Sequence, residues 1–180
     1  VFAATEPAAI KQSERLWWFD IVHNVFYRVG MFEAFDEFFE EVFARFEQPE
    51  SWRLFPETVD VLKTLKGQGF ELGIISNFDS RLFSVLRGLG IADLFDTVTI
   101  SSLAHAAKPS ARIFHQALEK HAVDPDEALH VGDSERDDVK GAQGVGLTGV
   151  LLARGEGARP SGGTTIGNLN ELLPLLSRLQ

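Results

Sequence analysis

Hydrophobic periodicity separates a helical first part of the chain from the rest. Between residues 12 and 29, apolar side chains recur every three or four positions, which predicts an amphipathic helix. Residues 31–46 place phenylalanines at the same spacing opposite acidic residues, which predicts a second helix that ends before Pro49. A phenylalanine stripe of this kind is more typical of helix packing than of a cofactor site. We therefore expect residues 1–52 to form a small, all-helical unit.

Short apolar runs alternate with helical patterns from residue 53 onward. The runs that predict strands are residues 70–75, 95–100, 128–131 and 149–152. The helical patterns cover residues 57–66, 79–90, 110–121 and 168–179, the last of them interrupted by Pro174. Because strands that alternate with helices form right-handed crossovers, these runs favour a parallel sheet. We predict an α/β fold for residues 53–180.

Composition excludes several classes of protein. The chain has 180 residues, of which 44% are hydrophobic and 24% charged, as in an ordinary soluble domain. Its net charge of −9 argues against a nucleic-acid binder or an anionic-membrane binder. No apolar run is long enough to cross a membrane. The sequence contains no cysteine, which excludes disulfides and fits a reducing compartment, so we expect a cytoplasmic location.

Polar side chains follow the predicted strands at the points where the strands end. Ser76 and Asn77 follow the first strand, and Lys108 lies in the loop beyond the second. Ligands of open parallel sheets bind beyond the carboxyl ends of the strands, so we expect these side chains to share one crevice. Hydroxyl, amide and ammonium donors suit a phosphoryl group, whose oxygens carry negative charge. The sequence therefore predicts that Ser76, Asn77 and Lys108 bind a small phosphorylated substrate.

A cluster of acidic residues follows the third strand. Asp133 comes directly after the strand, and Asp137 and Asp138 lie about one helical turn further along. Carboxylate oxygens at such a place suit a hard cation, with Mg2+ the usual choice. Acids in the first turn of a helix also complement the helix dipole, and for this stretch alone that interpretation stays open. The coincidence of hydroxyl, lysine and acids at three strand ends favours the functional interpretation.

Other catalytic patterns are missing from the sequence. The five histidines show no paired metal-ligand spacing. His130 lies inside a predicted strand, so we interpret it as a satisfied core or sheet residue rather than as a base. Neither a Gly-x-Ser-x-Gly motif nor a P-loop occurs, which leaves serine hydrolases and nucleoside triphosphatases without support.

Three segments resemble the motifs of a known family. Residues 74–77, Lys108-Pro109 and residues 132–138 are similar in order and spacing to motifs II, III and IV of the haloacid dehalogenase-like hydrolase superfamily. The Trp17-Trp18 pair and the first and third strand ends resemble its subgroup called haloacid dehalogenase-like hydrolase domain-containing protein 3.

The resemblance covers roughly residues 12–153 and implies a fold, an activity and a set of roles. The fold would be a Rossmann-like, three-layer core with a small helical cap. The activity would be that of a Mg2+-dependent phosphatase that acts on a small phosphorylated metabolite through an aspartyl-phosphate intermediate. Ser76 and Lys108 would be catalytic, the first binding the transferring phosphoryl group and the second stabilising its charge. Asp133 would bind Mg2+, and Asp138 would complete the metal site as an orienting acid.

One motif of this family has no counterpart in the sequence. Motif I, an Asp-x-Asp-x-Thr-like run after the first core strand, supplies the nucleophile and the general acid. No hydrophobic strand followed by such acids precedes residue 12, so we expect this chain to lack the nucleophile. In the family, the first core strand lies between the strands that end near Ser76 and Asp133. Without it, we expect unpaired strand edges, low stability and self-association.

Three alternatives stay open. A 2-haloacid dehalogenase needs no metal, and Asp133 after Gly132 argues for the phosphatase instead. A phospho-receiver domain also combines acids, a hydroxyl and a lysine around Mg2+, but it places the acids first and the lysine last. The missing motif leaves a non-catalytic binding or regulatory protein as the third alternative.

Overall fold

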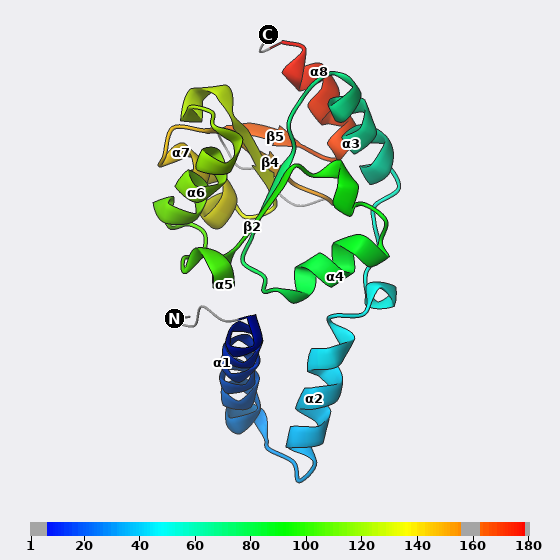
Figure 1. Ribbon diagram of the computed structural model, residues 1–180, viewed down its shortest axis with the longest axis vertical. Coiled ribbons are helices and arrows are strands. Elements are labelled where there is room, and N and C mark those ends of the chain that lie inside the picture. The colour runs from blue at the N-terminus through cyan, green and yellow to red at the C-terminus, as the bar shows by residue number, and fades with distance from the viewer. Residues whose placement is uncertain (1–6, 156–162, 179–180) are drawn as a thin grey trace.

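The computed structural model describes residues 7–155 and 163–178. Three helices precede the first strand, and strands and helices alternate after it as far as the fourth strand (Figure 1). The helices are α1 (Pro7–Val29), α2 (Phe35–Arg45), α3 (Thr58–Gly67), α4 (Arg81–Gly88), α5 (Ser101–Ala104), α6 (Ala111–His121), α7 (Gly141–Gln143) and α8 (Leu172–Leu176). The strands are β1 (Gly73–Ser76), β2 (Thr97–Ile100), β3 (Leu129–Gly132), β4 (Thr148–Leu152) and β5 (Thr164–Ile166). Single 3-10 turns cover Pro49–Ser51, Ala92–Leu94, Pro125–Glu127 and Leu169–Glu171, and a π-helical turn covers Glu135–Lys140.

Helices α1 and α2 form a hairpin that extends from one end of the α/β core (Figure 1). Their contact is aromatic: the ring of Phe19 meets Phe35 and Phe39 edge-on, with centroids 5.7 and 5.0 Å apart. Phe39 is 1% exposed, so the phenylalanine stripe serves helix packing as expected. The division between helical unit and core at residue 52 stays a prediction.

The parallel strands and the α/β class are confirmed. All three strand pairs are parallel, and the four predicted strands occur at the expected places. Strand β5 was not predicted, because its three residues are too few to show a period. The last predicted helix is split into a 3-10 turn and the short α8, and its final residue lies outside the described part of the chain.

The strands form two separate sheets within the described residues. One sheet has the order β1-β2 and the other has the order β3-β4-β5. In the first, Ser76 is level with Ile100, and in the second, Gly132 is level with Leu151. No ladder joins β1 to β3 in the described ranges. The expectation that the central core strand is missing stays a prediction.

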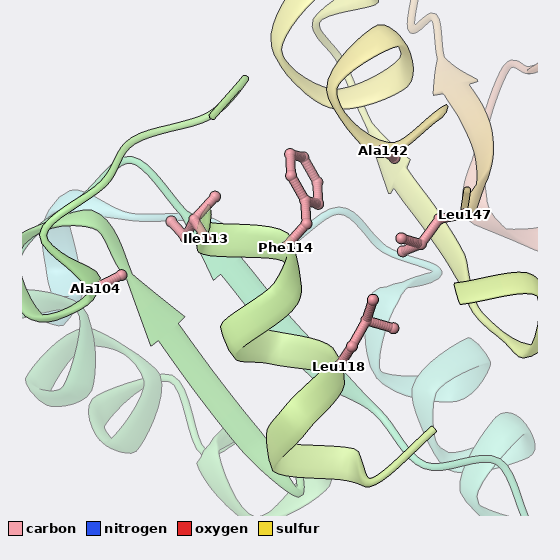
Figure 2. Packing of buried hydrophobic residues seen from close by; sticks show 6 residues of the cluster. All are labelled: Ala104, Ile113, Phe114, Leu118, Ala142 and Leu147. Carbon is pink, nitrogen blue, oxygen red and sulfur yellow. The ribbon is translucent and has the colours of Figure 1, made fainter. Parts of the chain in front are cut away.

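Helices cover the sheets on two sides. On one side, Phe114 and Leu118 point from α6 toward Ala142 and Leu147 (Figure 2). On the other side, α3 and α8 pack on the second sheet; the buried members of this cluster are Val61, Leu65, Val150, Ile166 and Leu172. The core therefore has three layers, as the Rossmann-like fold requires. Among the described residues, no helix is both long and apolar enough to span a membrane.

Candidate active site

The end of β1 is fastened to the loop after β2 by the side chain of Asn77. Its Nδ2 donates to the carbonyl of Lys108 at 3.0 Å, and the Lys108 amide donates back to Asn77 Oδ1 at 2.6 Å. This reciprocal pair holds the backbone of Lys108 beside the strand that ends at Ser76. Asn77 thus positions Lys108, and its predicted part in substrate binding is untested. Ser76 itself is half-buried at the last position of β1.

The ammonium group of Lys108 connects the two sheets. Its Nζ donates to the carbonyl of Ile75 in β1 at 2.9 Å and to Asp138 Oδ1 at 2.6 Å. The Lys108 side chain is 13% exposed, so the charge lies in a largely dry place. Two of the three ammonium protons are used by these partners. The third proton can be donated to a ligand in the crevice.

Asp138 is the most strongly held carboxylate of the site. It is 3% exposed, its Oδ1 lies 2.9 Å from His130 Nε2, and its Oδ2 accepts from the Ser134 amide at 3.0 Å. Burial by itself raises the pKa of Asp138, but the donors from His130, Lys108 and Ser134 outweigh it and hold this pKa far below its ordinary value. Asp138 therefore stays ionised and keeps the lysine side chain oriented.

A glycine and a serine shape the turn after β3. A Cβ atom on Gly132 would lie 2.1 Å from Cγ of Asp138, so only glycine leaves room for this carboxylate. The hydroxyl of Ser134 accepts from the Asp137 amide at 3.0 Å and caps the π-helical turn. The capping residue is therefore Ser134. Asp133 is exposed, and its side chain has no hydrogen bond or ion pair within the described ranges.

The carboxylates of the site meet only part of the requirements for binding a metal ion. Among the residues that the structure describes, no group of three or more His, Asp or Glu side chains is arranged to hold a metal ion. Mg2+ is commonly held by one or two carboxylates, with water and substrate phosphate filling the other positions. The exposed carboxylate of Asp133 suits that mode. Both oxygens of Asp138 are engaged by protein donors, so its predicted role as an orienting acid fits better than direct coordination of the metal. The assignment of Asp133 and Asp138 to a metal site stays a prediction.

Two features of the site were not found from the sequence. His130 is a satisfied sheet residue, as expected, but its partner is Asp138 of the site itself. The Ile75 carbonyl that receives the lysine is a backbone group, which no side-chain motif indicates. His130 lies on β3, and Asp138 lies in the turn that follows this strand. A polar residue in a strand directly before an acidic turn is a sequence signal that could have indicated this pair.

A buried polar cluster joins the helical hairpin to the loop after β1. Asp79 pairs with Arg81 at 2.5 Å and accepts from Trp18 Nε1 of α1 at 2.7 Å. The guanidinium of Arg81 also lies 3.7 Å from the ring centroid of Phe43 in α2. Glu14, 2% exposed, accepts from the amide and hydroxyl of Ser80. These contacts fix the hairpin close to the strand end that carries Ser76.

Comparison with known proteins identifies the class. The family described as haloacid dehalogenase-like hydrolase matches residues 9–146, which is most of the chain. The chain therefore belongs to the haloacid dehalogenase-like hydrolases, as the spacing of its strand-end motifs indicated.

Individual relatives show which members of this family the chain is similar to. The chain is 34% identical over 172 residues to haloacid dehalogenase-like hydrolase domain-containing protein 3 of Bos taurus, covering 91% of this chain and 68% of the relative, so the resemblance to that subgroup is confirmed. It is 36% identical over 101 residues to a glyceraldehyde 3-phosphate phosphatase of Methanothermobacter thermautotrophicus, covering 56% of this chain and 45% of the relative. A solved haloacid dehalogenase-like (HAD) phosphatase from Thermococcus onnurineus superposes with a TM-score of 0.70 at 34% identity, covering 77% of this chain and 64% of that one.

Proposed function

We propose that the crevice at the carboxyl ends of β1 and β3 binds a phosphoryl group, as part of a Mg2+-dependent phosphatase for small phosphorylated metabolites. The observation that carries the proposal is the largely buried ammonium of Lys108, held between the strand ends by Asp138 and Ile75. A fixed cation in a poorly hydrated place interacts strongly with phosphoryl oxygens. The similarity to a glyceraldehyde 3-phosphate phosphatase and to a solved HAD phosphatase supports this proposal.

The residues of the site have distinct parts in the proposed reaction. The Ser76 hydroxyl donates to one phosphoryl oxygen, and the third proton of Lys108 goes to another. Asp138 holds the Lys108 side chain in place, and Asn77 holds its backbone. Asp133 would hold Mg2+, which supplies positive charge to the phosphoryl oxygens when bound.

The proposal extends beyond this chain, which spans 45 to 68% of the relatives named above. In the whole protein, transfer would pass through an aspartyl-phosphate in the cytoplasm. The nucleophilic aspartate would come from motif I, for which this sequence shows no counterpart. We therefore expect this chain alone to hydrolyse p-nitrophenyl phosphate only at the background rate while it still binds phosphate.

Phosphate binding can be tested directly on the 180-residue chain. Inorganic phosphate is titrated into isotopically labelled protein with Mg2+ present, and amide resonances are followed by NMR. Shifts at Ser76, Asn77 and Lys108 are expected, and Lys108→Met should abolish them. Lys120→Met is the matched control, because Lys120 also donates to a strand carbonyl, that of Val98 inside β2, and not to a residue of the proposed site. Equal phosphate shifts in both variants would contradict the proposal.

The same titration separates the phosphatase from its alternatives. Shifts at these amides with 2-chloropropionate, independent of Mg2+, would favour a haloacid dehalogenase instead. Absence of shifts with either ligand, in a protein whose spectrum shows it to be folded, would favour a non-catalytic role.

A further inference from the structure

Helix α4 lies next to the helical hairpin and contacts it along one face (Figure 1). Arg81, Ser84 and Gly88 are three or four positions apart in this helix, so they share that face. Arg81 Nη1 donates to the Phe43 carbonyl at 2.7 Å, and the Ser84 hydroxyl donates to Glu47 Oε1 at 3.2 Å. These two bonds hold the end of α2 and the turn after it against the core.

A proline covers the last position of this face. Pro49 begins the 3-10 turn after the hairpin, and a Cβ atom on Gly88 would lie 2.0 Å from Cγ of Pro49. The ring of the proline therefore packs directly against the backbone of α4. Because packed surfaces of this kind have discrete arrangements rather than a continuous range, the turn cannot slide gradually along α4.

The segment that follows α2 is the one covalent connection between the hairpin and the core in the described part of the chain. Trp52 Nε1 donates to the Phe46 carbonyl at 3.1 Å, and the Trp52 ring meets Phe78 edge-on, with the centroids 5.6 Å apart. The guanidinium of Arg154 lies 3.6 Å from the ring centroid of Phe55. A hinge concentrates its φ and ψ changes in a few residues. These aromatic contacts hold the residues in which such a hinge would have to lie.

Arg81 joins both helices of the hairpin to the core. Its side chain is 6% exposed, and its Nε donates to Asp79 Oδ1 at 2.9 Å. Asp79 in turn accepts from Trp18 of α1, while the Arg81 guanidinium contacts the carbonyl and the ring of Phe43 in α2. Lifting the hairpin would break an indole hydrogen bond, a carbonyl hydrogen bond and a cation–π contact at the same time.

We propose that the hairpin is a fixed wall of the crevice at the end of β1 and that Arg81 holds it there. Hairpin and core then move as one body, and a ligand enters and leaves without any opening of the hairpin. A wall that does not move admits only ligands that fit this one arrangement, so the hairpin selects ligands by size. The alternative is a lid that swings away from the core, for which the contacts along α4 would have to break in every cycle. The proposal concerns the motion of the hairpin and does not depend on the proposed phosphoryl site.

The test measures the distance between hairpin and core in the 180-residue chain. The sequence contains no cysteine, so Glu37→Cys in α2 and Glu119→Cys in α6, both at exposed positions, provide two unique sites for nitroxide labels. Labelled chain is diluted with unlabelled chain, so that pulsed electron spin resonance measures only distances within one molecule. The expected result is a single narrow distribution that does not change when inorganic phosphate and Mg2+ are added. A second distance in the free chain, or a changed distance with phosphate, would show a lid and overturn the proposal.

Replacement of Arg81 tests its part directly. Arg81→Lys keeps a positive charge but loses the fork that reaches Asp79 and Phe43 together, so the distance distribution should broaden. Arg112→Lys, at an exposed position of α6, is the matched control and should leave the distribution unchanged. A distribution in Arg81→Lys as narrow as that of the control would overturn the proposal.

A pair of glycine variants gives an independent arm of the test, which also decides if Arg81→Lys does not fold. Gly88→Ala places a methyl group against Pro49, so the hairpin should shift relative to the core. Gly67→Ala, at the corresponding last position of α3, adds a methyl group with no neighbour within 4 Å and is the control. A changed distance in Gly88→Ala alone would support the fixed contact. Equal distances in both variants would show that the turn yields freely against α4 and would overturn the proposal.

Discussion

Replacing Asp138 by asparagine removes one charge from a buried ion pair and leaves the other in place. In Asp138→Asn, the ammonium of Lys108 keeps the Ile75 carbonyl but loses its only anionic partner among the described residues. Breaking a buried pair in this way typically costs about 3–5 kcal/mol. Because the Lys108 side chain is 13% exposed and retains one acceptor, we expect a loss near the lower limit, about 3 kcal/mol.

Urea unfolding at neutral pH, followed by tryptophan fluorescence, measures this loss. For a chain of this length, it corresponds to a melting temperature lowered by about 6–12 °C. Asp137→Asn is the matched control, because within the described ranges the Asp137 carboxylate pairs only with Arg136, at 3.8 Å. Its replacement should change stability by less than about 0.5 kcal/mol. A change in Asp138→Asn as small as that of the control would refute the account of the ion pair.

The pH dependence of the Asp138 effect has a definite sign. The pKa of Asp138 is depressed in the folded state, so its contribution to stability is complete above the unfolded pKa, about 3.9, and is lost as the pH falls toward the folded pKa. The stability difference between the native chain and Asp138→Asn should therefore be constant near neutral pH and shrink below about pH 4.

Three further predictions concern the metal, the hairpin and the strand edges. Mg2+ should bind this chain only in the millimolar range, because the acidic residues after β3 form an incomplete set of oxygen ligands, in which Asp138 is already engaged by protein donors. NMR should show the effect at Asp133, and micromolar binding that survives Asp133→Asn would be inconsistent with the assignment. Glu14→Gln should lower the free energy of unfolding by about 1–2 kcal/mol in chemical denaturation, because it weakens the charge-assisted hydrogen bonds from Ser80. An unchanged unfolding midpoint would argue that the contact between Glu14 and Ser80 does not stabilise the hairpin against the core. Sedimentation at tens of micromolar should show self-association of the chain through the edges of β1 and β3. A chain that stays monomeric and unfolds cooperatively above about 60 °C would contradict the expected self-association and low stability.

Much of the site could be predicted from where polar residues follow apolar runs. The rule that parallel strands share one carboxyl edge brings Lys108 and Asp138 together, and the structure places them 2.6 Å apart. The same rule placed Ser76 and Asp133 at the ends of β1 and β3. Local periodicity sufficed here because each strand and its turn are adjacent in the sequence.

Contacts between distant segments could not be predicted in this way. The bond between Trp18 and Asp79 joins residues 61 positions apart, and that between Glu14 and Ser80 joins residues 66 apart. Such pairs leave no periodic signal, since each member is explained locally, as part of a helix face or of a turn.

The most direct measurement of the central claim is a crystal structure of the 180-residue chain grown with Mn2+ and inorganic phosphate. Anomalous scattering locates the metal, which substitutes for Mg2+. The account predicts a metal at a carboxylate oxygen of Asp133, and a phosphate whose oxygens lie about 2.7–2.9 Å from the Ser76 hydroxyl and the Lys108 ammonium. Phosphate bound elsewhere, with the strand ends of β1 and β3 holding only water, would contradict it.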